Sequence, residues 1–227
     1  MITNANINNK KKVLLITNHK SGDILLNLLK NCPFIFEVKI GSPNVLKEMT
    51  ESFLILFDCV IYDLCDGGFG VNHENKKEII EEYIKNDGGS FLVTHDQWDN
   101  TVSGPLNLIG LERLNNFEFI RTNKARVYRE HELFNSYNNL TNWGKIDIAT
   151  THQTFHKIIE GHETAKIIME LELDKATNVR HNYLVVNECG LGRIAYWAAG
   201  DSNTISEKEK KLFINIVAWL TKLKYNN

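Results

Sequence analysis

The sequence predicts an α/β fold, in which a mostly parallel central sheet has helices on both faces and an antiparallel hairpin near the C-terminus. Continuous apolar runs of strand length, such as Val13-Leu-Leu-Ile16, are typical of strands buried on both faces of a parallel sheet. These runs alternate with segments whose apolar residues recur at helical spacing, which predicts β-α-β units. The length of 227 residues suits one such domain. We expect it over residues 11–224, after a disordered, asparagine-rich tail at residues 1–10.

The first half of the chain alternates strands with helices. Strands are expected where apolar runs are flanked by polar residues, at 12–17, 34–40, 57–63 and within 88–99. Ser21 and Asp23 can cap the first helix, and Ser42-Pro43 is typical of an N-cap with proline in the first turn of the second. The third helix starts at about His73, with Ile79, Ile80, Tyr83 and Ile84 as its buried stripe, and Gly88 is well placed as its C′ residue.

In the second half of the chain, the pattern of apolar residues is weak from about residue 100 to residue 141 and becomes clear after it. A short helix at 105–111 and a short strand at 125–129 are expected, followed by strands at 145–149, 165–173 and 183–188. Cys189-Gly-Leu-Gly192 then turns the chain into an antiparallel strand at 193–198. The last helix is predicted by a capping box of Ser206 and Glu209 and by an amphipathic stripe between Leu212 and Leu223.

Composition excludes several classes of function. The net charge is −2 and acids are interspersed with bases, so the chain offers no basic face for nucleic acid. No apolar run approaches the roughly 20 residues of a membrane span, and the N-terminus lacks the apolar core of a signal peptide, so we expect a cytoplasmic protein without a membrane partner. The four cysteines have no CxxC spacing and are expected to be free thiols: Cys32, Cys59, Cys65 and Cys189.

Polar residues follow directly after the predicted strands, where ligands bind in open α/β sheets. These residues are His19, Asp66, His95, Asp96 and Asp201. If the protein is an enzyme, His95 is the general acid or base, and Asp96 or Asp201 is its orienting carboxylate. The remaining candidates are expected to bind substrate: His19, Asp66, Trp98, His131 and His152. Each also has a structural alternative, as a helix cap, a turn residue or part of the core.

The same residue types would suit a divalent metal, and this alternative stays open. No local ligand pair such as HExxH occurs, so we assign no metal ligand and expect no cofactor.

Four segments in sequence order resemble the trehalose-utilization (ThuA-like) family, within the class I glutamine amidotransferase-like superfamily. They are Val13-Leu-Leu-Ile-Thr-Asn-His19, Gly88-Gly-Ser-Phe-Leu-Val-Thr-His95, His131-Glu-Leu-Phe134, and Gly190-Leu-Gly-Arg-Ile-Ala-Tyr196 with Phe213-Ile-Asn-Ile-Val-Ala-Trp-Leu220. The resemblance implies a flavodoxin-like, amidotransferase-like sandwich. Two positions depart from the family pattern: Glu132 replaces its proline, and Asp201 stands where a Gly-His pair would end the segment after Tyr196.

Glutaminase chemistry does not fit the residues. That mechanism needs a cysteine on the turn after the fourth strand and a histidine late in the chain, and this sequence has neither. We therefore expect a ThuA-like domain that binds a small polar ligand, carbohydrate-like by family association, at the strand ends. The alternative is a catalytically silent interaction or assembly module, for which a homodimer through an exposed apolar face would fit.

Overall fold

The computed structural model describes residues 11–17, 21–32, 36–42, 45, 49–63, 74–94, 104–113, 122–148, 156–158, 164–172, 181–198 and 205–223. The predicted tail at residues 1–10 lies outside them. The helices are α1 (Ser21–Lys30), α2 (Glu51–Leu54), α3 (Glu74–Lys85) and α4 (Glu207–Leu220), with short 3₁₀ helices η2 (Gly104–Ile109) and η3 (Glu132–Asn135). The first strands are β1 (Lys11–Thr17), β2 (Phe36–Gly41), β3 (Cys59–Asp63), β4 (Ser90–Thr94) and β5 (Leu111–Arg113). The later strands are β6 (Lys124–Val127), β7 (Lys145–Asp147), β8 (His156–Ile158), β9 (Lys166–Leu171), β10 (His181–Cys189) and β11 (Gly192–Trp197).

One nine-stranded sheet has the order β2-β1-β3-β4-β11-β10-β9-β6-β7, and β5 pairs with β8 separately. Strands β2, β1, β3, β4 and β11 are parallel to one another, whereas the pairs from β11 to β7 are antiparallel. The prediction of a mostly parallel sheet is therefore wrong, because the sheet is mixed. Parallel neighbours need a long crossover, which α1 supplies between β1 and β2 and α3 supplies between β3 and β4. Strands β10 and β11 are joined by a turn of Gly190 and Leu191, which permits only antiparallel pairing.

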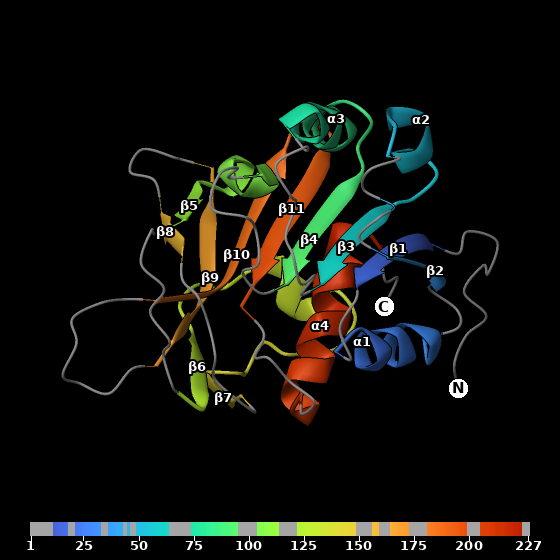
Figure 1. Ribbon diagram of the computed structural model, residues 1–227. Helices are drawn as coiled ribbons and strands as arrows, with labels where there is room; N and C mark the ends of the chain where they lie inside the picture. The colour runs from blue at the N-terminus through green and yellow to red at the C-terminus, as the bar shows by residue number, and fades with distance from the viewer. Residues whose placement is uncertain are drawn as a thin grey trace.

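Helices cover both faces of the sheet, as expected. Helices α1 and α4 contact each other on one face, while α2, α3 and η2 pack together on the other (Figure 1). Of the predicted apolar stripe of α3, Ile80, Tyr83 and Ile84 are buried and Ile79 is half-buried. In the described part of the chain, no helix is long and apolar enough to span a membrane.

Helix α4 begins with the predicted capping box of Ser206 and Glu209. Its burial differs from the predicted stripe, because every residue from Leu212 to Leu220 is buried. The segment around η3 covers the outer side of the helix. Asn215 shows this best: its Nδ2 donates to the carbonyl oxygens of Leu133 and Asn138, and its Oδ1 accepts from the Asn138 N–H at 2.7 Å. A polar side chain on a buried helix face is thus fully hydrogen-bonded.

Other predicted elements occur with shifted ends. The segment at 105–111 forms the 3₁₀ helix η2 and then β5, and β8 was not predicted. Pro43 lies outside the described residues, and the helix described after β2 is α2, whose N-cap Thr50 accepts from the Phe53 N–H. Gly88 has a φ of 73°, in the left-handed region that favours the glycine predicted there.

Candidate functional site

Four adjacent parallel strands end in register at one edge of the sheet. Thr17 at the end of β1 is opposite Asp63 of β3, Asp63 is opposite Thr94 of β4, and Thr94 is opposite Trp197 of β11. Each of these residues is the last of its strand. We call the set Thr17, Asp63, Thr94 and Trp197 the strand-end edge.

Most of the predicted site residues follow the strand-end edge in the sequence but lie outside the described residues. They are His19, Asp66, His95, Asp96, Trp98, His152 and Asp201. Their predicted roles therefore stay predictions. Of the predicted site residues, the structure describes His131.

Asp63 is the central residue of the strand-end edge and has no exposed surface. Its Oδ2 accepts a hydrogen bond from Thr17 Oγ1 at 3.0 Å, and its Oδ1 accepts one from Thr94 Oγ1 at 2.6 Å. A buried carboxylate is unfavourable unless hydrogen bonds replace its water, and here donors from both neighbouring strands do so. One side chain thus joins the ends of three strands.

Sequence reasoning missed this network. Thr17 and Asp63 appeared there as the last residues of predicted strands and Thr94 within the segment 88–99, and none of the three was named as a site residue. The available signal was that three apolar runs each end on a hydroxyl or a carboxyl group, although strand order is needed to know that these groups meet.

A second buried network lies beside the end of β11. Tyr183 of β10 donates its hydroxyl to Glu209 Oε1 at 2.8 Å, and Glu209 Oε2 accepts from the Ser206 N–H. Burial, with a further contribution from the Glu209 carboxylate, raises the pKa of Tyr183 well above its usual value, so the phenol stays protonated and can donate. The Tyr183 carbonyl also accepts from the Ala198 N–H at 2.8 Å. The chain is therefore held on both sides of the segment that carries Asp201.

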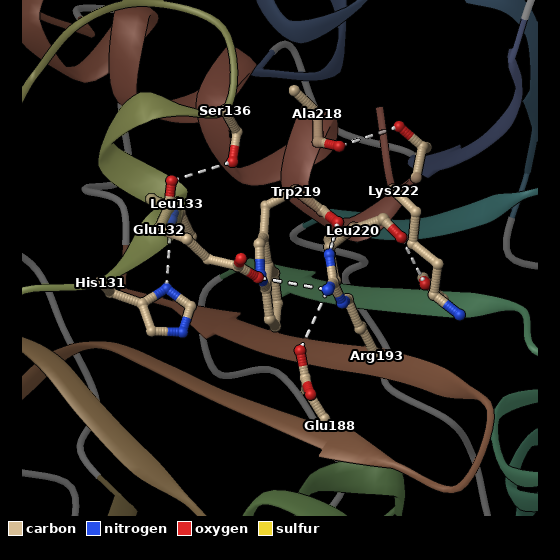
Figure 2. Close-up of polar contacts among 12 residues, drawn as sticks. His131, Glu132, Leu133, Ser136, Glu188, Arg193, Ala218, Trp219, Leu220 and Lys222 are labelled. Atoms are coloured by element: carbon tan, nitrogen blue, oxygen red, sulfur yellow. Dashed lines mark hydrogen bonds and ion pairs between the residues drawn. The ribbon is translucent and has the colours of Figure 1, made fainter. Parts of the chain in front are cut away.

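His131 belongs to a third cluster, on the face covered by α4 (Figure 2). Its Nδ1 accepts from the Leu133 N–H at 3.2 Å, which makes it the N-cap of η3. Its ring meets the Trp219 indole edge to face, with centroids 5.3 Å apart. Burial lowers the pKa of His131, and among the nearby charges Glu132 opposes this shift. The neutral imidazole is the form that can accept the capping bond.

The rest of this cluster connects Trp219 to Arg193 (Figure 2). The indole Nε1 donates to Glu132 Oε1 at 2.7 Å. The Arg193 guanidinium lies 4.7 Å from the Trp219 ring, donates to the Trp219 carbonyl at 2.7 Å, and pairs with Glu132 and Glu188 at 3.2 and 3.0 Å. Glu132 thus accepts from two partners at once.

The cluster places His131 apart from the strand-end edge. Arg193 stands near the beginning of β11, whereas the strand-end edge is where β11 finishes, at Trp197. Through Trp219, the structure ties His131 to the packing of α4 and η3, and it does not bring His131 together with Thr17, Asp63 and Thr94.

The described cysteines are not poised as nucleophiles. Burial raises the pKa of Cys59 and Cys32, and it raises that of Cys189 to about 11. All three are free thiols, and at neutral pH they carry their protons. Cys65 lies outside the described residues. Within those residues, no group of three or more His, Cys, Asp or Glu side chains is placed to hold a metal ion.

Solved structures share this fold. A cytoplasmic protein from Salmonella typhimurium matches with a TM-score of 0.66 at 15% identity, over 92% of this chain and 98% of that chain. A protein from Bacteroides uniformis described as ThuA-like matches with a TM-score of 0.66 at 12% identity, over 92% of this chain and 91% of that chain. A carbohydrate deacetylase matches with a TM-score of 0.54 at 11% identity, over 94% of this chain and 32% of that chain. No protein-family model and no curated protein sequence matches. At these identities, the likeness shows an α/β fold shared with a ThuA-like structure.

Proposed function

We propose that the chain is a cytoplasmic ThuA-like protein of the amidotransferase-like, flavodoxin-like fold, and that it binds a small, polar, carbohydrate-like metabolite beside the strand-end edge. The observation that carries the proposal is the buried Asp63 carboxylate, which joins the ends of β1, β3 and β4 through Thr17 and Thr94. A rigid base at the carboxyl ends of parallel strands is where ligand-binding loops are positioned in open α/β sheets.

The residues that follow this base supply the chemistry. His95 comes directly after Thr94 and is the proposed general acid or base, with Asp96 or Asp201 as its orienting carboxylate. Trp98 offers a flat apolar face to a sugar ring, and His19 and Asp66 offer hydrogen bonds to hydroxyl groups. The ThuA-like and carbohydrate-deacetylase neighbours support a carbohydrate-like ligand by analogy of fold.

A thermal-shift screen with sugars, sugar acids and divalent cations tests the proposal, since a ligand that binds only the native state raises the melting temperature. We expect at least one sugar or sugar acid to raise it. His95→Ala should remove that shift. His131→Asn is the matched control, because His131 packs under α4; it should lower the melting temperature of the free protein and leave the ligand-induced shift in place.

Two results would count against the proposal. A screen without any shift would favour the catalytically silent interaction module. A ligand-induced shift that persists unchanged in His95→Ala would remove His95 from the site. The proposal also excludes glutaminase activity, so ammonia release from glutamine should stay at the uncatalysed rate.

A further inference from the structure

The exposed edge of the nine-stranded sheet at β2 carries a self-complementary pattern. Within the described part of the chain, β2 pairs with β1, and the sheet has no strand beyond it. Glu37 and Lys39 on this strand are exposed, Val38 between them is half-buried, and Ile40 is 51% exposed. An edge strand presents backbone groups that can pair with another strand.

We propose that β2 is a homodimer interface, in which the β2 strands of two copies pair antiparallel across a two-fold axis at Val38. In this register Val38 is opposite Val38 of the second copy, and Glu37 is opposite Lys39 in both directions. Residues directly opposite each other in an antiparallel pair lie on the same face, so two Glu–Lys ion pairs form on one face. An isologous contact of this kind closes as a dimer.

The charges select this register over its neighbours. A shift of the axis to Glu37 would put the two copies of Glu37 opposite each other, and a shift to Lys39 would do the same with lysine. Intermediate registers would put a charged residue opposite an apolar one, because a one-residue slip exchanges the two faces of a strand. The pairing centred on Val38 places opposite charges together and leaves Val38 beside its own copy.

The position of Lys39 supports the same pairing. Its Nζ lies 5.3 Å from the centroid of the Phe53 ring in α2, so the lysine lies on the face of the sheet that α2 covers. Glu37 is two residues away on the same strand and therefore shares that face. A lysine alone on an edge strand discourages pairing, whereas a glutamate at this spacing turns repulsion between copies into attraction.

Charge-reversal variants of the full chain test the interface by sedimentation velocity over a wide range of protein concentration. The wild-type protein should form a dimer that weakens as the salt concentration rises. Glu37→Lys alone and Lys39→Glu alone should each raise the dimer Kd by about tenfold or more, since each converts two opposite-charge pairs into like-charge pairs. The double variant should dimerise as the wild type does.

An equimolar mixture of the two single variants provides the most discriminating measurement. Each chain repels its own copy but complements the other, so the mixture should dimerise at a protein concentration at which either variant alone is mostly monomeric. Glu78→Lys, an equal charge change on the exposed side of α3, is the control and should leave the dimer unchanged. Circular dichroism should show wild-type folding for all variants, because both substituted β2 positions are exposed. A monomeric wild type, single variants that dimerise as tightly as the wild type, or a mixture that stays monomeric would each overturn the proposal.

Discussion

Replacing Thr94 with valine tests whether the buried Asp63 carboxylate holds the strand-end edge together. Valine keeps the volume of threonine but removes the hydroxyl that donates to Asp63 Oδ1 at 2.6 Å. Thr94 is 1% exposed, so water cannot easily replace the lost donor. A hydrogen bond to a charged group contributes about 1.5–3 kcal/mol, and we expect the free energy of unfolding to fall by about that amount.

The contribution of the acceptor's charge to stability can be separated from the contribution of the hydrogen bond itself. In an Asp63→Asn background the acceptor is neutral, and Thr94→Val should then lower the free energy of unfolding by only about 0.5–1.5 kcal/mol. The difference between the two backgrounds is the coupling energy of a double-mutant cycle. Urea unfolding followed by circular dichroism measures each value from the transition midpoint at constant slope.

Thr141→Val provides the matched control, because the Thr141 side chain is exposed and its hydroxyl bonds only to the local Asn139 side chain among the contacts described. This change should stay within about 0.5 kcal/mol of the wild type. Equal losses for Thr94→Val in the Asp63 and Asn backgrounds, or a loss no larger than that of the control, would refute a charged network at the strand-end edge.

Three further predictions concern the rest of the fold. Trp219→Phe removes the 2.7 Å bond to Glu132 and should lower the free energy of unfolding by about 1–3 kcal/mol in urea titrations; an unchanged midpoint would contradict the role of this bond. Burial lowers the pKa of His131 in the native state, so the unfolded state binds more protons than the native state does. The free energy of unfolding should therefore fall as the pH drops below about 6.5. His131→Asn should flatten this part of the pH profile of the melting temperature. Gly190→Ala places a Cβ against the Lys85 carbonyl oxygen of α3 at a φ of 58° and should strongly lower the melting temperature. Gly144→Ala, with open space around its Cβ, should leave the melting temperature unchanged, and similar effects of the two substitutions would refute the steric account.

The candidate site shows the limit of sequence reasoning most clearly. From the sequence, the polar residues that follow the predicted strands pointed to one edge of the sheet. The registers of β1, β3, β4 and β11 place the ends of these strands side by side. His131 looked like a member of the same set, since it is a histidine in a segment that resembles the family pattern. Its contact with Trp219 depends on how η3 docks on α4, and that docking joins residues far apart in the chain.

The sequence by itself determined the elements whose signals are local: the buried strands, the stripe of α3, the α4 capping box and the turn at Gly190. These follow from periodicity and backbone preference, which act over a few residues. Only the tertiary structure decided that the sheet is mixed, that α4 is covered on its outer side, and that Asp63 sits between Thr17 and Thr94. Each of these depends on strand order and packing, because hydrogen bonds such as Thr94 to Asp63 exist only after separate strands have become neighbours.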